Sequence, residues 1–259
     1  DELQKFGFGT LTGIDIHGEM RGLLPSTEWK RTAYKRPEQQ KWYAGETISL
    51  GIGQGYNNFT MLQLALATSV IANDGVKMKP HLVKEVVDVV TRTSKETLKE
   101  IKAEAIAKPQ NIAVIRNALV GVNTEGTGAT AFRGAAYVAA GKTGTAQVVA
   151  IKQNEKYNAA RTAERLRDHA LYMAFAPADN PKIALAMVVE NAGFGGANAA
   201  PIARRVFDYW LLGKMPTPED MAAVQKGQAG PPGSAPNPPA ATASSAVAAA
   251  AASPASAAP

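Results

Sequence analysis

Two consecutive apolar segments, 171–176 and 183–190, constrain this chain most strongly, because together they predict a β-hairpin. The Pro-Ala-Asp-Asn-Pro between them consists of residue types that favour turns. One face of each strand is large, and much of the other face is alanine. We expect both faces to be covered, with a helix packed closely over the small one.

A third segment, Ala139–Val149, begins with small residues and ends with β-branched ones, which predicts another strand. It contains Lys142-Thr143-Gly144-Thr145, an unusual set for a buried strand. One interpretation is an edge strand with a solvated lysine, and the other is one wall of a catalytic site. The Lys-Thr-Gly triplet is the third motif of the serine acyl-transfer enzymes that react with penicillin.

Three helices are predicted around these strands. Thr60 and Gln63 form a capping box ahead of an apolar segment that ends near residue 73. Apolar residues from 112 to 122 recur at helical spacing, and Pro201 begins a last helix before Gly213. The expected fold class is α+β, an antiparallel sheet covered by helices on both faces, with part of the helical layer encoded upstream.

Two further regions have distinctive compositions. Residues 7–60 are rich in Gly, Pro and Thr, so we expect a long and largely irregular region that packs over a site. Residues 215–259 are rich in Ala, Pro, Gly and Ser, and we expect them to be disordered. The predicted domains are therefore a folded part at 1–214 and a tail at 215–259.

The composition excludes several functions. The chain has 259 residues with a net charge of +6, which suits an anionic neighbour, but no basic run interleaved with aromatics indicates nucleic-acid binding. It has no cysteine, and its three histidines lack metal-ligand spacing, so we expect neither a metal site nor another cofactor. No apolar run reaches the roughly 18 residues of a bilayer span.

Acyl transfer gives each residue of Lys142-Thr143-Gly144-Thr145 a role. A strand edge can bind an extended peptide, and its N–H groups can stabilise a carbonyl oxygen that becomes negative. The ammonium of Lys142 supplies positive charge for a substrate carboxylate, which the hydroxyls of Thr143 and Thr145 can also bind. Gly144 has no side chain, which allows a substrate to approach the backbone closely.

Four motifs occur in a family-specific order: Gly-Phe-Gly-x-x-Thr-Gly-Ile-Asp (7–15), Gly-Ile-Gly-Gln-Gly-Tyr (51–56), Ala-Gly-Lys-Thr-Gly-Thr-Ala-Gln (140–147) and Ala-Glu-Arg-Leu-Arg-Asp-His-Ala-Leu (163–171). With them the chain resembles the C-terminal half of a class B penicillin-binding transpeptidase over roughly residues 1–213. The fourth motif is similar to that of the elongation-specific branch. Four ordered motifs are far more specific than Lys-Thr-Gly alone.

The resemblance implies a peptidoglycan D,D-transpeptidase that cross-links stem peptides during cell elongation and is the target of β-lactams. It also implies a location at the periplasmic face of the bacterial inner membrane, with an anchor upstream of this chain. The implied partners are stem peptides, a membrane glycan polymerase and elongation-complex proteins, and nucleic acid is not among them. Lys142 would be catalytic, with Thr143, Gly144 and Thr145 binding substrate or penicillin.

The chain departs from the family pattern in one respect. A Ser-x-x-Lys motif should supply the nucleophile and its base, and this sequence contains none. Thr27-Glu-Trp-Lys30 and Thr32-Ala-Tyr-Lys35 have the spacing, but we interpret them as chance matches in a loop region. The chain also begins at Asp1, so we expect a fragment whose serine lies upstream and which is inactive alone.

Other interpretations remain open. Tyr56, Phe194 and Gly195 are predicted to border the substrate groove. His169 is either a general base or a structural histidine ahead of a strand. The Gly-x-Gly-x-Gly at 51–55 lacks the spacing and the βαβ context of a nucleotide loop. The chain could also be a non-catalytic partner-binding module, or a β-lactamase or D,D-carboxypeptidase, which would share Lys-Thr-Gly.

Overall fold

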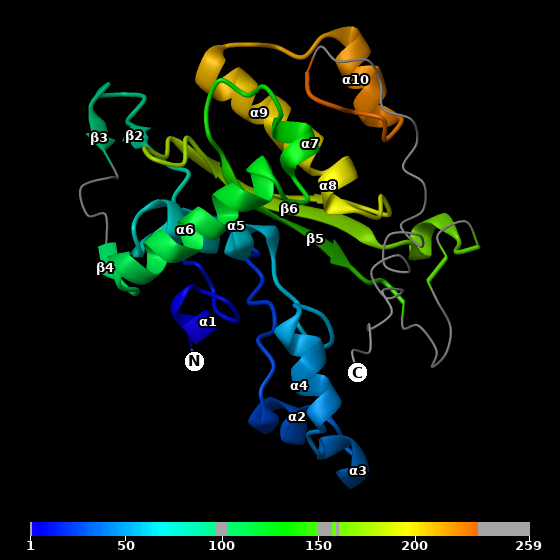
Figure 1. Ribbon diagram of the computed structural model, residues 1–259. Coiled ribbons are helices and arrows are strands. Elements are labelled where there is room, and N and C mark those ends of the chain that lie inside the picture. The colour runs from blue at the N-terminus through cyan, green and yellow to red at the C-terminus, as the bar shows by residue number, and fades with distance from the viewer. Residues whose placement is uncertain (1, 97–102, 150–156, 159–160, 233–259) are drawn as a thin grey trace, which may run out of the picture.

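A three-stranded antiparallel sheet lies at the centre of the protein. The computed structural model describes residues 2–96, 103–149, 157–158 and 161–232. The sheet has the order β5-β6-β7 and consists of β5 (Ala140–Ala146), β6 (His169–Ala176) and β7 (Ile183–Val189). Helices cover both of its faces (Figure 1). The α+β class, the hairpin and the Lys142 strand are confirmed.

The first face of the sheet packs against α5 (Met61–Ala72) and α6 (Pro109–Thr124). The capping box predicted at the start of α5 is present, since Thr60 Oγ1 accepts a hydrogen bond from Gln63 N at 3.1 Å and Gln63 Oε1 accepts one from Thr60 N at 3.1 Å. Ile112 of α6 and Phe175 of β6 are fully buried in the core on this side. These contacts hold in place the face of the sheet on which Lys142 lies.

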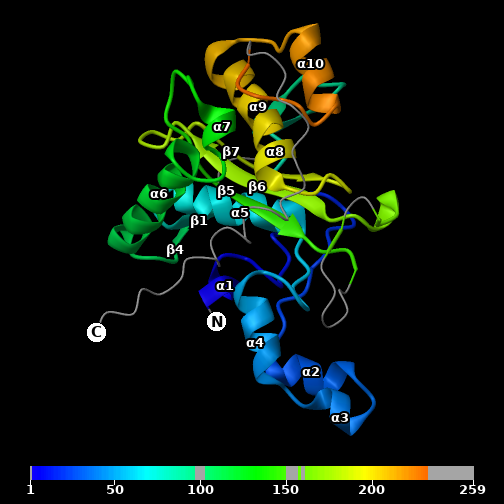
Figure 2. The same ribbon diagram turned by 45° about the vertical axis from the view of Figure 1, so that its right-hand side comes forward.

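The second face packs against α7 (Ala129–Phe132), α8 (Gly195–Asn198) and α9 (Ala200–Leu212), which lie together above the sheet (Figures 1 and 2). Its core consists largely of small residues around three rings, Phe132, Tyr172 and Phe207. Pro201 lies in the first turn of α9, and Gly213 ends the helix with a φ of 66°.

The faces of the hairpin differ in one respect from the expectation of a large face and a small face. Ala174 pairs with Leu185, and both belong to the core beneath α9. Phe175 pairs with Ala184, and both belong to the core beneath α5 and α6. Large side chains of one strand therefore lie beside small ones of the next, so that each face has an even height and both faces accept helices.

The expected boundary at residue 214 also differs from the structure. Helix α10 (Pro218–Gln225) lies inside the segment expected to be disordered, and its Asp220 is buried. Asp220 Oδ1 accepts a hydrogen bond from Arg205 Nη2 of α9 at 2.7 Å. This ion pair links the helix to α9, and Ala223 of the helix is buried as well. Residues 233–259 lie outside the described residues, and there disorder remains a prediction.

Residues 26–56 project from the body as a unit of three helices, α2 (Thr27–Ala33), α3 (Pro37–Gln40) and α4 (Ala44–Gly51) (Figures 1 and 2). The expectation of a largely irregular region is therefore wrong for this part of 7–60. The unit contains a buried cation, Lys30, which forms an ion pair with Glu46. Pro37 is the first residue of α3, a position that proline favours.

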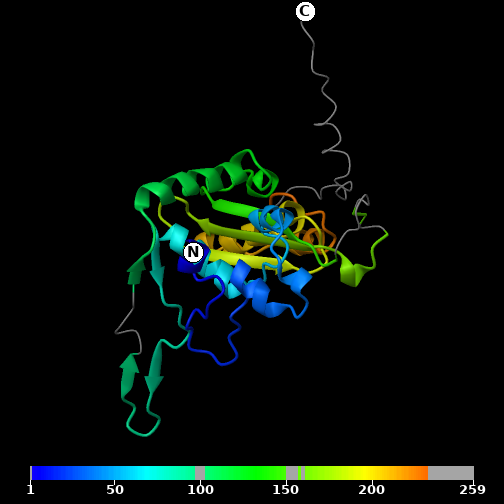
Figure 3. The ribbon, with the colours of Figure 1, turned by 90° about the horizontal axis from the view of Figure 1, so that it is seen from below.

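The remaining elements are short. Helix α1 (Glu2–Lys5) precedes the first loop, and a 3-10 turn (Glu164–Leu166) precedes β6. Strands β1 (Val76–Met78) and β4 (Ala103–Ala105) form one antiparallel pair, and β2 (Glu85–Val87) and β3 (Ser94–Glu96) form another, which extends from the body (Figure 3). None of the helices within the described residues has the length and apolar character required to cross a bilayer.

Candidate active site

The Lys-Thr-Gly-Thr motif lies on β5, one of the two edge strands of the sheet within the described residues. The strand begins buried at Ala140 and becomes accessible at Lys142, which is exposed. Because side chains of a strand alternate between faces, Lys142 shares the face of Ala140, and Thr143 and Thr145 lie on the opposite face. The ammonium and the two hydroxyls therefore reach the strand edge from opposite sides.

The ammonium of Lys142 lies close to the backbone of its own strand. Its Nζ donates a hydrogen bond to the carbonyl oxygen of Thr143 at 2.8 Å. No carboxylate among the described residues forms an ion pair with it under 4.0 Å. An exposed cation held only by a backbone carbonyl is available to a negatively charged ligand.

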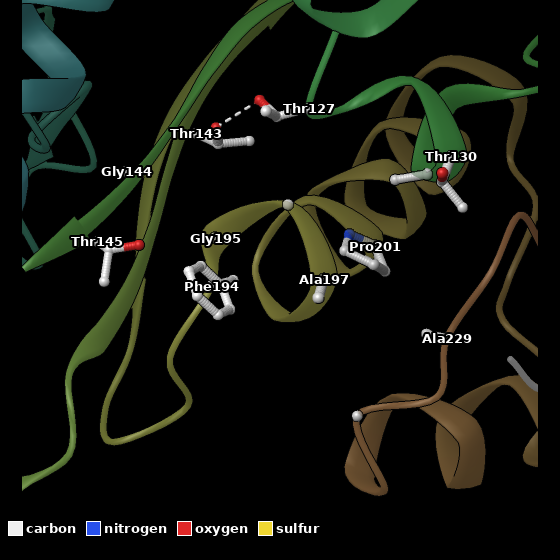
Figure 4. Close-up of a pocket in the computed structure, with 13 residues that line it drawn as sticks. Thr127, Thr130, Thr143, Gly144, Thr145, Phe194, Gly195, Ala197, Pro201 and Ala229 are labelled. Carbon is white, nitrogen blue, oxygen red and sulfur yellow. Dashed lines mark hydrogen bonds between the residues drawn. The ribbon is translucent and has the colours of Figure 1, made fainter. Parts of the chain in front are cut away.

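A pocket of about 690 Å³ lies on the threonine side of β5 (Figure 4). Its walls come from β5, from the segment Phe194–Ala197 and the start of α9, from α7 with the segment that leads into it, and from the segment after α10. The lining residues are Thr127, Thr130, Ala131, Thr143, Gly144, Thr145, Phe194, Gly195, Gly196, Ala197, Pro201, Gly227 and Ala229. Four threonine hydroxyls and an aromatic ring give the pocket both polar and apolar surfaces.

The hydroxyls of two pocket threonines are hydrogen bonded to each other. Thr127 Oγ1 and Thr143 Oγ1 are 2.6 Å apart, and either can be the donor (Figure 4). Thr127 follows α6 by a short turn and is separated from Thr143 by 16 residues. Thr127 was not predicted as a site residue, since it belongs to none of the sequence motifs of the site.

Close backbone packing closes the inner end of the pocket. A Cβ atom added at Gly195 would lie 2.0 Å from the carbonyl oxygen of Leu171 and 2.6 Å from that of Gly144. One added at Gly196 would lie 2.4 Å from the carbonyl oxygen of Thr127. Glycine at both positions lets α8 rest directly on the two strands and on the Thr127 loop. Gly195 and Gly196 are thus part of the packed site.

A buried hydrogen-bonded pair supports β5 from behind. Tyr172 Oη donates to Asn123 Oδ1 at 2.8 Å, and Asn123 Nδ2 donates to the carbonyl oxygen of Ala139 at 3.0 Å. Burial raises the pKa of the Tyr172 hydroxyl, so the group stays a neutral donor. A Cβ at Gly141 would lie 2.4 Å from Tyr172 Oη, which makes this glycine part of the same arrangement.

The predicted border residues have different positions. Phe194 and Gly195 line the pocket together with Thr143, Gly144 and Thr145. Tyr56 lies instead in the projecting unit, where its hydroxyl donates to Glu46 Oε1 at 2.8 Å, and its role at a groove stays a prediction. That carboxylate and burial together raise the pKa of Tyr56, burial being the larger cause. Neither Tyr56 nor Lys142 is a lining residue of the pocket.

His169 lies at the start of β6, where its Nδ1 accepts a hydrogen bond from Asn191 N at 2.9 Å. The ring therefore joins the first residue of β6 to the chain that leaves β7. Beside it, Asp168 is buried, and this burial raises the pKa of its carboxyl group. The contact of His169 fits the structural interpretation of this histidine, which needs no general base.

Residues 1–208 match the penicillin binding protein transpeptidase domain, and the chain belongs to this family. Within the family it is similar to the peptidoglycan D,D-transpeptidase MrdA of Haemophilus influenzae, at 44% identity over 84% of this chain and 33% of the relative. The MrdA of Escherichia coli K12 is 39% identical over 81% of this chain and 32% of the relative. The chain thus spans about a third of the length of these curated relatives.

Solved structures agree with this assignment. Pseudomonas aeruginosa PBP2, in complex with WCK 5153, has a TM-score of 0.64 at 38% identity, with 81% of this chain and 41% of that chain covered. PBP2 of Helicobacter pylori, in a complex with MreC, has a TM-score of 0.63 at 26% identity, with 81% and 35% covered. The resemblance to the penicillin-binding protein 2 branch is confirmed.

Proposed function

We propose that the protein to which this chain belongs is a peptidoglycan D,D-transpeptidase of cell elongation and a target of β-lactams. The family membership and the MrdA relatives support the activity. The observation that carries the proposal is the position of Lys142-Thr143-Gly144-Thr145 on an edge strand of the sheet, beside a pocket of about 690 Å³. An edge strand next to a cavity can bind an extended peptide.

The proposed reaction has two steps. A serine oxygen attacks the carbonyl carbon of the penultimate D-Ala of a stem peptide, and the peptide bond to the last residue breaks with release of D-alanine. The amine of a second stem peptide then attacks the acyl-enzyme ester, forms the cross-link and returns a proton to the serine. A β-lactam ring opens on the same serine and leaves a stable ester.

The serine is proposed to come from outside this chain. The sequence contains no Ser-x-x-Lys motif, and the curated relatives are about three times as long. Thr27 and Thr32 both lie in helix α2 of the projecting unit, so the expectation of a loop region there is wrong. Lys30 of the same helix is buried in an ion pair with Glu46. This environment supports the interpretation of the Thr-x-x-Lys spacings as chance matches.

Lys142 is proposed as the catalytic cation of the β5 wall. Its ammonium favours a deprotonated group nearby and attracts the terminal carboxylate of a stem peptide. Thr143 and Thr145 are proposed to contact the same ligand from the pocket side, and the N–H groups of the strand edge to stabilise the oxyanion. Gly144 leaves the backbone accessible from the Lys142 face. No step requires a cofactor.

The proposed location is the periplasmic face of the inner membrane, where the substrate is assembled. A glycan polymerase of the membrane and other elongation proteins are proposed partners, and the complex of the Helicobacter pylori relative with MreC supports the second group. The exposed β2–β3 hairpin offers a surface away from the pocket. Stem peptides and β-lactams are the proposed small ligands.

Labelling with a fluorescent penicillin tests this function. We expect the full-length protein to form a covalent adduct, the Lys142→Ala variant to lose at least about 99% of the labelling rate, and this chain alone to give none. Lys182→Ala is the matched control, because Lys182 is exposed in the turn between β6 and β7. Normal labelling of Lys142→Ala would exclude the role of its ammonium.

The products distinguish transfer from hydrolysis. A stem peptide ending in D-Ala-D-Ala is incubated with the full-length protein in the presence of an amine acceptor. Transpeptidation yields the cross-linked peptide and one D-alanine for each bond formed. Release of D-alanine with no cross-linked product would indicate a D,D-carboxypeptidase instead, and absence of labelling in the full-length protein would contradict the proposed function.

A further inference from the structure

The outer edge of β5 is covered by side chains instead of a neighbouring strand. Among the described residues no strand pairs with this edge, although backbone groups of alternate residues point toward it. Side-chain donors bind three of these carbonyl oxygens: Asn123 at Ala139, at 3.0 Å, Lys142 at Thr143, at 2.8 Å, and Gln54 at Thr145, at 2.5 Å. Unpaired strand edges bind other chains readily, and side-chain donors that occupy the carbonyl oxygens of an edge prevent such pairing.

Gln54 makes contacts that resemble those of a paired strand. Its Nε2 donates to the carbonyl oxygen of Thr145 at 2.5 Å, and its Oε1 accepts from the N–H of Gln147 at 3.4 Å. A residue of a neighbouring parallel strand also contacts a carbonyl and an N–H that are two residues apart. The side-chain amide of Gln54 therefore occupies one complete binding position for a peptide on the edge of β5.

The backbone around Gln54 is fixed, so the side chain is the part that can move. Gln54 N donates to the carbonyl oxygen of Ser49 at 3.0 Å, and Asn57 Nδ2 donates to the carbonyl oxygen of Gln54 at 3.2 Å. The flanking Gly53 and Gly55 have positive φ values of 79° and 71°, which hold the turn in a shape that other residues rarely adopt. Rotation of the Gln54 side chain alone would expose Thr145 and Gln147.

We infer that Gln54 caps the substrate-binding edge of β5 and is displaced when an extended peptide pairs with Thr145 and Gln147. This inference rests on the proposed function, because it assumes that the ligand binds along β5. Gln54 belongs to the turn that ends the projecting unit, and 91 residues separate it from Thr145. Gln54 then sets the affinity of the edge for peptides and β-lactams without taking part in the bond-making steps.

The test separates binding from chemistry in the full-length protein. Stopped-flow labelling with a fluorescent penicillin gives the dissociation constant of the non-covalent complex and the acylation rate constant. We expect Gln54→Ala to lower the dissociation constant about five-fold, as the loss of one competing hydrogen bond implies, and to leave the acylation rate constant unchanged. Gln54→Glu cannot donate to the Thr145 carbonyl and should act in the same direction.

Gln39→Ala is the matched control, because Gln39 is an exposed glutamine of α3 in the same unit and should change neither constant. Hydrogen exchange of the Gln147 amide measures the cap without any chemistry, and Gln54→Ala should accelerate it. Unchanged exchange would overturn the cap, and weaker binding or slower acylation in Gln54→Ala would show that Gln54 supports the edge instead. Absence of labelling in the wild-type protein would overturn the proposed function. It would also overturn the inferred competition between Gln54 and a bound peptide, whatever the exchange rate of Gln147.

Discussion

Gly195 shows how single residues shape the pocket. Its backbone lies so close to Leu171 and Gly144 that any side chain would overlap carbonyl oxygens of both strands. Backbone atoms inside a sheet cannot move away as a flexible side chain can. The first turn of α8 can therefore lie against β5 and β6 only if this position is glycine, and the site depends on a residue that contributes no functional group.

Gly195→Ala is expected to destabilise the protein by about 1–3 kcal/mol, because the added methyl group forces α8 away from the sheet. Urea unfolding followed by circular dichroism measures this loss. Gly45→Ala is the matched control: a Cβ at Gly45 meets no atom within 4 Å, and Gly45 lies in helix α4, so the change should stay within about 1 kcal/mol. Equal stability of both variants would contradict the packing argument.

At this scale the sequence predicted the residues that form a contiguous motif and missed those that meet through space. Lys142-Thr143-Gly144-Thr145 was predictable because its functional residues are consecutive in the sequence. Thr127 and Gln54 contact the strand across 16 and 91 residues of chain, and Asn123 binds Ala139 across 16 and Tyr172 across 49. A contact of that kind depends on how α6, the projecting unit and the sheet pack, which no local pattern contains.

At the scale of elements, a buried ion pair links helix α10 to α9. Arg205 of α9 reaches Asp220 Oδ1 at 2.7 Å and the carbonyl oxygen of Gly230 at 3.3 Å, so it binds the helix and the segment after it. Gly227 and Ala229 of that segment line the pocket. Removing the carboxylate would leave a buried guanidinium without its partner, which costs about 3–5 kcal/mol unless the helix detaches.

Asp220→Ala is therefore expected to release α10 from α9. Even about 1.4 kcal/mol gives tenfold more of the detached state, so trypsin should cleave after Lys214 and Lys226 at least about tenfold faster. Glu219→Gln is the matched control, because Glu219 is an exposed carboxylate of the same helix. Cleavage at the wild-type rate in Asp220→Ala would show that other contacts hold the helix.

The sequence did contain a signal for α10 that composition concealed. Thr217 Oγ1 accepts from Asp220 N at 3.2 Å, and Pro218 occupies the first turn, so Thr-Pro-Glu-Asp is a regular helix start. Averaging over 215–259 mixes these residues with the Ala/Pro segment that follows. By contrast, α5, α6 and α9 were predictable because their apolar spacing and their caps or end signals extend over many residues.

At the scale of the whole molecule, the projecting unit has a centre of its own, separate from the two cores of the sheet. Lys30 is 3% exposed, and its ammonium forms an ion pair with Glu46 and donates to the carbonyl oxygen of Lys41 at 2.8 Å. The ring of Tyr56 lies 5.6 Å from the same ammonium. A unit held by a buried cation carries little apolar periodicity, which explains why the sequence predicted an irregular region there.

This centre makes the unit sensitive to acid. The hydrogen bond from Lys30, with that from Tyr43 N, holds the pKa of Glu46 below its ordinary value. A carboxyl group whose pKa is lower in the folded state stabilises it fully above the unfolded value, about 4.3, and loses this contribution as the pH falls through the folded value. The unit should therefore loosen below about pH 4.3. The sheet should unfold at lower pH, because its two cores are large and apolar, although a buried Arg204–Asp208 ion pair lies beside one of them.

Tryptophan fluorescence can follow this loosening, because two of the three tryptophans, Trp29 and Trp42, belong to the unit. In a Trp210→Phe variant, Trp29 and Trp42 are the only tryptophans of this chain. Trp210 is exposed on α9, so its replacement should be tolerated. We expect their emission to shift to the red between about pH 4.3 and pH 3, ahead of the loss of circular dichroism. Glu46→Gln should give the shifted emission at neutral pH and remove its pH dependence. If the emission and the circular dichroism change together, the unit and the sheet unfold as one.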